Sequence, residues 1–413
     1  MPRLRPLLAL VALCSLLSSS TTRADDPAPL KPVLPGLELA DGDSIVFLGD
    51  SITHQRLYTQ YVEDYFYTRM PHLRLQLHNA GVGGARAWDA LARFDEDVAA
   101  YNPKYVTILL GMNDGSYQPY NEEVFLTYER DMTALLARLE EINAIAIPMT
   151  PTMFDARADR MKANNRRDPR SIALYNSVLA YYGTWLRDEA EQRGLGFVDM
   201  WGPLNNITLE QRKKDPKFTL IQDAIHPGAS GQVVMATAII NDLALPRQVS
   251  TITIQLPTGD AGKIVSRANG GELTDVLRSE QGVTFTFTAK SLPWVLPEEA
   301  ALGVELTKLG HKLSREALEV HGLPAGQYKL VIDGVEVGQY SAATLERHVE
   351  LQGNAKTPSI SRHCRWPCST SSVTKVRSMT CAVSGRTSSD SPVPGRLRRR
   401  SPQTRSCRSN SPR

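Results

Sequence analysis

Between Asp43 and about Leu245, short apolar runs alternate with longer stretches of helical periodicity, and this alternation constrains the fold more than any other feature. The apolar runs predict buried strands at residues 44–48, 73–77, 105–110, 142–149 and 196–199. The stretches between and after them predict helices at residues 58–70, 88–100, 122–141, 171–192 and 231–243. Apolar strands that alternate with helices indicate a parallel sheet covered on both faces. We therefore expect a doubly wound α/β domain, in which ligands bind at the carboxyl ends of the strands.

The pattern changes after Pro246. Residues 251–256, 283–287 and 328–332 alternate polar and apolar side chains with a period of two, which is typical of strands with one buried face. An Asp-Gly pair at 333–334 adds a hairpin signal. We expect a first domain at residues 25–248, followed by a small, mostly β accessory domain at residues 249–354.

Residues 355–413 lose this patterning. From residue 361 onward the chain has twelve Lys or Arg residues and one acid, Asp390, so this part carries a charge of +11. Because the whole chain carries +3, the first 360 residues carry −8, and we expect no nucleic-acid binding by the body. The tail fits a basic segment for anionic partners, a disordered segment, or a stretch translated in the wrong frame. We favour the frame error, with disorder next, because the composition changes abruptly at a point where the β domain should not yet be complete.

Residues 1–24 have the composition of a secretory signal peptide. Arg3 and Arg5 precede a short apolar stretch at residues 7–17, and Thr22 and Ala24 put small residues at the −3 and −1 positions of a cleavage site. About eleven apolar residues are too few to cross a bilayer core of ~30 Å, and no later stretch is longer. We therefore expect an exported protein, secreted or periplasmic, with no membrane span.

Ser51 follows the first predicted strand, in the sequence Gly-Asp-Ser-Ile-Thr at residues 49–53. A serine on a tight strand-to-helix turn has its hydroxyl at the edge of the sheet, beside helix N–H groups that favour an anion. This geometry suits a nucleophile whose attack creates an oxyanion. The tripeptide Gly-Asp-Ser by itself, however, is more typical of an ordinary turn.

Two further segments follow the second and third predicted strands. The sequence Asn-Ala-Gly-Val-Gly-Gly at residues 79–84 permits close backbone approach to a substrate, or forms a plain flexible loop. It lacks the GxGxxG and Lys-Ser/Thr patterns of phosphate-binding loops. Asn113, in Gly-Met-Asn-Asp at residues 111–114, either points a neutral N–H donor across the same edge or forms an Asx turn.

Asp223 and His226 stand three residues apart in a predicted loop late in the domain. This spacing lets the carboxylate accept from imidazole Nδ1–H, which leaves Nε2 as a free base. The other seven histidines have no comparable Asp partner. Because the body has no HExxH pattern, no His pair with ligand spacing and no cysteine between Asp25 and Pro358, we expect no metal, disulfide or thiol nucleophile there.

Together these four segments resemble the conserved blocks of the GDSL/SGNH hydrolases, in the family's order and at about its spacing. The resemblance covers roughly residues 43–245 and does not extend to the β-rich part or the tail. It implies the SGNH hydrolase fold, with a flavodoxin-like parallel sheet, and a reaction that needs no metal or organic cofactor.

Carried over position by position, the resemblance implies that Ser51 is the nucleophile and that His226 and Asp223 complete a triad. It also implies an oxyanion hole formed by the Ser51 and Gly84 N–H groups and the Asn113 side chain. The family often has Asp after that glycine, whereas this chain has Ala at position 85. This departure leaves the hydrogen bonding of the loop open.

The resemblance and the signal sequence favour a secreted serine esterase that cleaves short acyl groups, such as acetyl, from a small-molecule or polysaccharide ester. A lipid esterase, an O-acyltransferase with the same triad and a noncatalytic carbohydrate-binding module are the alternatives. The aromatic side chains of residues 58–67 fit an acyl- or sugar-binding stripe, but their spacing is more typical of a hydrophobic core.

Overall fold

A computed structural model describes residues 31–162, 167–257, 262–358, 360 and 378–385 of the 413-residue chain. The signal-peptide prediction for residues 1–24 therefore lies outside the described residues. Most of the predicted basic tail lies outside them as well. Among the helices that are described, none combines the length and the apolar character that crossing a membrane requires.

A parallel four-stranded sheet lies at the centre of the first part of the chain. Its strands occur in the spatial order β2-β1-β3-β4, and every neighbouring pair is parallel. Their bounds are β1 Ser44–Gly49, β2 Gln76–Gly81, β3 Tyr105–Leu109 and β4 Ile145–Pro148. Beyond β4, the predicted fifth strand is reduced to one parallel bridge between Met149 and Val198. The order is that of a flavodoxin-like sheet, and the predicted α/β class is confirmed.

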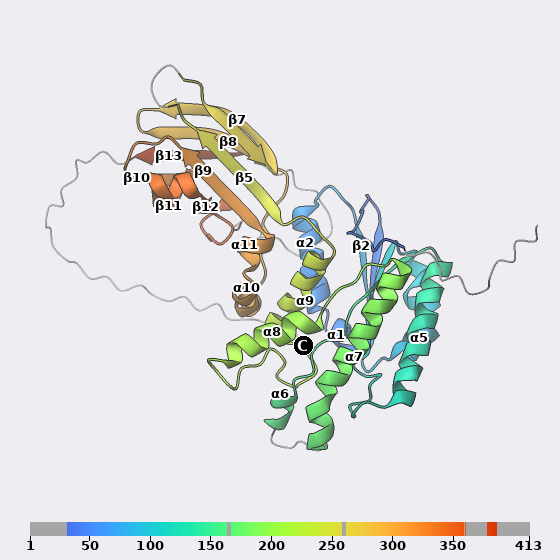
Figure 1. Ribbon diagram of the computed structural model, residues 1–413. Helices are drawn as coiled ribbons and strands as arrows, with labels where there is room; N and C mark the ends of the chain where they lie inside the picture. Colours follow the sequence, from blue (N-terminus) through green and yellow to red (C-terminus); the bar gives the residue numbers. More distant parts are fainter. Residues whose placement is uncertain (1–30, 163–166, 258–261, 359, 361–377, 386–413) are drawn as a thin grey trace, which may run out of the picture.

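Helices cover both faces of this sheet (Figure 1). Helices α2 (Leu57–Arg69) and α9 (Ala229–Asp242) pack together on one face, and α5 (Glu122–Glu141) and α7 (Pro169–Arg193) lie on the other. The shorter helices are α1 Ser51–His54, α3 Ala87–Ala92, α4 Phe94–Asp97, η1 Ala99–Tyr101, α6 Ala156–Arg160 and α8 Trp201–Arg212. Because helices exclude water from both sides, all six residues of β1 are buried.

The aromatic side chains of α2 belong to the core, as their spacing suggested. Tyr58, Tyr61, Tyr65 and Phe66 are each at most 2% exposed, whereas Tyr67 is 50% exposed and hydrogen-bonds Glu63 on the same helix. A binding stripe would need these rings at a surface. The four buried rings instead fill the space between α2 and its neighbours.

The second strand lies further along the chain than predicted. The apolar residues 73–77 suggested it, but Leu73 N–H closes a turn on Met70 C=O, and pairing with β1 begins only at Gln76. β2 is an edge strand and only Ala80 of its six residues is buried. An edge strand exposed to water does not need apolar side chains, so hydrophobicity placed this element poorly.

Two smaller sheets follow α9 and pack face to face as a sandwich (Figure 1). One has the order β11-β10-β13-β8-β7 and the other β12-β9-β5-β6. Their bounds are β5 Gln248–Gln255, β6 Val265–Asn269, β7 Gly271–Ser279, β8 Gly282–Ala289, β9 Arg315–His321, β10 Gln327–Ile332, β11 Val335–Ser341, β12 Val349–Glu350 and β13 Ser378–Gly385. Ile254, Phe285, Val320 and Leu330, from four different strands, are at most 1% exposed and form the centre of the core.

β13 comes from the stretch that we expected to be a patternless tail. It pairs antiparallel with both β10 and β8 and lies between them in the five-stranded sheet. Ser378–Gly385 therefore belongs to the β region. The interpretation of residues 355–413 as a frame-shifted or disordered tail stays a prediction. A lone eight-residue strand far from its partners leaves little periodicity to detect, so the sequence pattern did not indicate β13. The domain boundaries stay a prediction.

The β region and the α/β region share a buried contact. The segment with η2 (Glu298–Ala300), α10 (Ala301–Thr307) and α11 (Leu309–Leu313) packs against α9, and α12 (Ala342–Arg347) stays with the β sandwich. Trp294, just before η2, is 3% exposed and packs edge-to-face on Tyr65 with ring centroids 5.4 Å apart. Aromatic burial of this kind fixes the position of one region against the other.

Candidate active site

Ser51 is the first residue of α1, directly after β1. The preceding Asp50 is the N-cap, and its Oδ1 accepts from Ile52 N–H at 2.8 Å. A side chain at position 49 is impossible without rearrangement, because a Cβ on Gly49 would lie 2.1 Å from Thr53 Oγ1. The Gly-Asp-Ser sequence thus builds the sharp strand-to-helix turn that the motif suggested.

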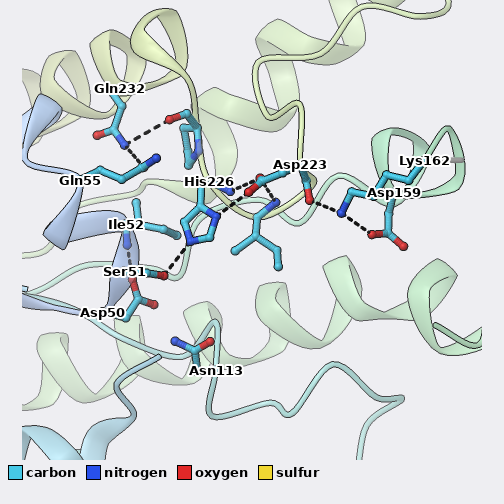
Figure 2. Close-up of polar contacts among 12 residues, drawn as sticks. Asp50, Ser51, Ile52, Gln55, Asn113, Asp159, Lys162, Asp223, His226 and Gln232 are labelled. Carbon is cyan, nitrogen blue, oxygen red and sulfur yellow. Dashed lines mark hydrogen bonds and ion pairs between the residues drawn. The ribbon is translucent and has the colours of Figure 1, made fainter. Parts of the chain in front are cut away.

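His226 reaches Ser51 from the loop before α9 (Figure 2). Its Nε2 lies 2.8 Å from Ser51 Oγ, and its Nδ1 lies 2.6 Å from Asp223 Oδ2. The second carboxylate oxygen of Asp223 accepts from the backbone N–H groups of Ile225 and His226, at 3.0 and 2.7 Å. The three side chains therefore form one continuous hydrogen-bonded relay.

The electrostatics of Asp223 suit this role. Partial burial raises the pKa of Asp223, but the hydrogen bonds from His226 and from the backbone N–H groups outweigh it, and the pKa falls below its ordinary value. The carboxylate is thus ionised near neutral pH. An ionised acceptor at Nδ1 keeps the imidazole in the tautomer that leaves Nε2 free to take a proton.

The turn between Asp223 and His226 has unusual backbone geometry. Ala224 has φ of +73°, in the left-handed region, and is fully buried. Its N–H donates to Ile221 C=O and its C=O accepts from Asp155 N–H, at 2.9 and 3.0 Å. A left-handed alanine persists only where its surroundings fix it. The hydrogen bonds to Ile221 and Asp155 fix the backbone of Ala224 in this conformation.

Asn113 follows β3 and lies beside Ser51 on the side away from His226 in Figure 2. Its Oδ1 accepts from Tyr117 Oη–H at 3.0 Å, and its Nδ2 donates to Ala85 C=O at 3.1 Å. The tyrosine hydroxyl sets the orientation of the amide, because Oδ1 must then face Tyr117. One N–H of the carboxamide remains for a substrate oxygen.

Gly84 lies in the loop after β2, the third predicted element of an anion site. It has φ of +76°, and a Cβ there would meet no atom within 4 Å, so this backbone faces open space. The start of the loop is tied to β1 through Val82 N–H, which donates to Gly49 C=O at 3.1 Å. Asn79 fixes its base, with Nδ2 donating to Thr53 C=O at 2.8 Å.

The structure shows how this loop is held although alanine stands at position 85. Ala85 is buried, and Asp114 accepts from Ala87 N–H through one oxygen and from Gly111 N–H through the other, at 2.8 and 2.9 Å. Asp114 therefore joins the Gly84 loop to the Asn113 loop. Burial raises the pKa of Asp114 to about 6, against the opposing effect of these N–H donors.

Several of these neighbours have no role in the prediction from the sequence motifs. Asp50 precedes Ser51 and Asp114 follows Asn113, so both stand inside the recognised motifs. A carboxylate beside each of these two residues was a signal available in the sequence. Lys162 donates to Asp223 C=O, and Tyr117 orients Asn113, but neither stands in a motif. Among the described residues, no group of three or more His, Cys, Asp and Glu side chains is arranged to hold a metal ion.

Part of the chain is similar to known proteins. Residues 47–234 match the model of the GDSL-like Lipase/Acylhydrolase family. An acetylxylan esterase from Geobacillus stearothermophilus is 26% identical over 228 residues, which cover 50% of this chain and 96% of that protein.

Among solved structures, the gut microbial diltiazem-metabolizing enzyme BT4096 superposes with a TM-score of 0.70 at 26% identity. The match covers 80% of this chain and 77% of that one, so the likeness extends beyond the α/β region into the β region. With its residues 47–234, this chain belongs to the GDSL-like lipase/acylhydrolase family of esterases.

Proposed function

We propose that the protein is an exported serine esterase that removes short acyl groups, above all acetyl, from carbohydrate esters. The observation that carries the catalytic part is the relay from Ser51 Oγ to His226 Nε2 and from His226 Nδ1 to Asp223, with distances of 2.8 and 2.6 Å. The proposal of export rests on the signal-like composition of residues 1–24.

In the first half-reaction, His226 Nε2 takes the proton of Ser51 as its hydroxyl oxygen attacks the ester carbonyl. Asp223 stabilises the imidazolium that forms and keeps the ring aligned. The imidazolium then gives its proton to the leaving alcohol, and an acyl-serine remains. In the second half-reaction, water attacks the acyl-serine and gives a proton to His226, which passes this proton to Ser51 Oγ as the bond to the acyl group breaks and the acid leaves.

Each attack puts negative charge on the carbonyl oxygen. We assign its stabilisation to the N–H groups of Ser51 and Gly84 and to the Asn113 amide. The Ser51 N–H is at the start of α1, the Gly84 N–H is in an open loop, and the Asn113 amide is held in orientation by Tyr117. Fixed donors of this kind need no reorganisation when the charge develops, which is why they lower the barrier.

Two observations support a carbohydrate ester as the substrate. The side chains of His226 and Asp223 are 29% and 51% exposed, so an ester carried on a large, hydrophilic alcohol can approach Ser51 from solvent. The similarity to an acetylxylan esterase over 96% of that protein favours acetyl as the acyl group. A lipid esterase would need a long apolar channel for its acyl chain.

Hydrolysis of an ester panel tests the proposal. We expect the purified protein to cleave aryl acetates faster than butyrates and longer esters, and to release acetate from acetylated xylan. Product analysis with and without an acceptor sugar separates hydrolysis from acyl transfer. Strong preference for long-chain esters, with no acetate released from any acetylated carbohydrate, would contradict the assigned substrate class.

A further inference from the structure

Asp159, at the end of α6, is a buried carboxylate that pairs with two cations among the described residues. Its side chain is 1% exposed, and Oδ1 accepts from Lys162 Nζ at 2.9 Å and from Arg167 Nη1 at 3.0 Å. Taking a carboxylate out of water is costly unless it is paired. Both cations lead on to groups of the proposed active site, and neither stands in a recognised motif.

Lys162, which we call the first arm of the Asp159 cluster, contacts the backbone of Asp223, the carboxylate residue of the relay. Lys162 Nζ donates to the backbone C=O of Asp223 at 2.5 Å while it is paired with Asp159 (Figure 2). This carbonyl immediately precedes the left-handed Ala224, whose own C=O is held by Asp155 at the start of the same helix. α6 thus fixes the turn that aims Asp223 at His226 from two sides.

Arg167, the second arm of the Asp159 cluster, contacts Tyr117, which lies on the Asn113 side of Ser51. The guanidinium carbon of Arg167 lies 4.7 Å from the ring centroid of Tyr117 and 5.8 Å from that of Phe154. Tyr117 is the residue whose hydroxyl orients Asn113. Both Ser116 and Tyr117 have positive φ, of +57° and +53°, so this loop needs support from its surroundings.

We propose that Asp159 is a positioning residue that holds both halves of the catalytic machinery at once. Through Lys162 it fixes the backbone of Asp223, and through Arg167 it fixes the ring that orients the Asn113 amide. The inference rests on the proposed function, because it takes Asn113 and Asp223 as parts of the reaction. It predicts that the loss of Asp159 weakens both the proton relay and oxyanion binding.

Double-mutant cycles in the full-length protein test this proposal, with kcat and KM measured on an aryl acetate. Arg167→Met should lower kcat about tenfold with little change in KM, and should cost nothing further in an Asn113→Ala background. Lys162→Met should lower kcat by a similar factor in both backgrounds, because it acts on the other arm. In the wild-type background, Asp159→Asn should lower kcat by the product of the Arg167→Met and Lys162→Met factors. In the Asn113→Ala background, it should lower kcat only by the Lys162→Met factor.

Matched controls separate positioning from general stability. Arg187→Met removes a guanidinium 5.1 Å from the ring of Phe197, and Lys213→Met breaks an exposed ion pair with Glu210. Both should leave kcat unchanged. Lys162 and Arg167 are themselves about one third exposed, so their variants carry the test even where Asp159→Asn does not fold.

Two outcomes overturn the inference. One is an unchanged kcat in folded Lys162→Met and Arg167→Met, whatever their melting temperatures. The other is a decrease in kcat on Arg167→Met that is equally large in the wild-type and the Asn113→Ala backgrounds. Ser51→Ala, measured alongside, keeps the two proposals apart. An active Ser51→Ala protein refutes the proposed function, whereas an inactive one with ineffective arm variants refutes only the role of Asp159.

Discussion

Ser51 Oγ and His226 Nε2 lie within hydrogen-bonding distance, 2.8 Å, although 175 positions separate the two residues in the chain. The contact forms because the carboxyl end of β1 and the loop before α9 meet at one edge of the sheet. In an open α/β sheet this edge is where ligands bind. The relay is therefore a consequence of topology.

Removal of the Asn113 amide should reduce turnover while leaving the relay intact. We expect Asn113→Ala to lower kcat by about 10²–10³, with a small change in KM, because the lost donor acts on charge that develops in the transition state. Steady-state kinetics on an aryl acetate measure this effect. Ser51→Ala, which removes the nucleophile, should abolish turnover almost completely. An Asn113→Ala enzyme with wild-type kcat would refute the assigned donor.

The acid Asp50 should make stability depend on pH. Burial raises the pKa of Asp50 to about 7, and nearby Asp114 contributes, although the Ile52 N–H lowers it. A raised pKa means that the folded state binds the proton more tightly than the unfolded state. The free energy of unfolding therefore falls as pH rises from about 4 to about 7. Asp50→Asn keeps an acceptor for Ile52 N–H and should remove this part of the fall, on the order of 1–3 kcal/mol.

Urea denaturation at several pH values between 4 and 8 measures the Asp50 effect. Asp41→Asn is the matched control. Hydrogen bonds from Arg74 lower the pKa of Asp41 to about 2, so this exposed group stays ionised in the folded protein over the whole range. Above about pH 5, where Asp41 is ionised in the folded and the unfolded state alike, its variant should differ from wild type by a constant amount. Parallel curves for Asp50→Asn and wild type would show that Asp50 does not titrate in this window.

Position 224 should accept glycine and reject a β-branched residue. Glycine adopts φ of +73° without the strain that alanine carries, about 1–2 kcal/mol, but it loses more conformational freedom on folding. We expect Ala224→Gly to change stability by less than about 1 kcal/mol and to keep kcat. Ala224→Val should lose at least about 2 kcal/mol and most of the activity, because the turn that aims Asp223 must change. Thermal melts and kinetics on both variants provide the check.

The close contact between α10 and α9 should be sensitive to a single methyl group. A Cβ on Gly303 would lie 2.6 Å from Ser230 C=O, so Gly303→Ala must push the two helices apart. We expect a loss of about 1–3 kcal/mol in unfolding free energy, with unchanged kcat while the protein stays folded. Gly353→Ala is the control, since a Cβ there meets no atom within 4 Å. Equal stability of the two variants would mean that the helices separate without cost.

The α/β class and the convergence of Ser51, Asn113 and His226 were predictable because buried parallel strands are apolar throughout and end at one edge. Helix α5 was predicted with its observed bounds, Glu122–Glu141, since an amphipathic helix has a strong period. The predicted helix 88–100 is instead divided among α3, α4 and η1. α8 was not predicted, because Trp201–Arg212 contains Gly, Pro and two Asn near its start.

The ion-pair centre at Asp159 shows where reasoning from sequence stops. Charged residues three apart usually form a solvated helix face, and nothing in the pattern marks Asp159 as 1% exposed. Its partner Arg167 acts through Tyr117, which is distant in the chain. Only the three-dimensional packing reveals that these residues belong together.

The early place of Ser51, the proposed nucleophile, has a consequence for biosynthesis. A ribosome adds Ser51 long before it reaches codon 226, so the growing polypeptide carries an ordinary alcohol with no base beside it. In the proposed mechanism, reactivity arises only after the segment that contains His226 has been made and folding has brought it to Ser51. An enzyme arranged in this order is harmless to the esters around it until its synthesis is well advanced.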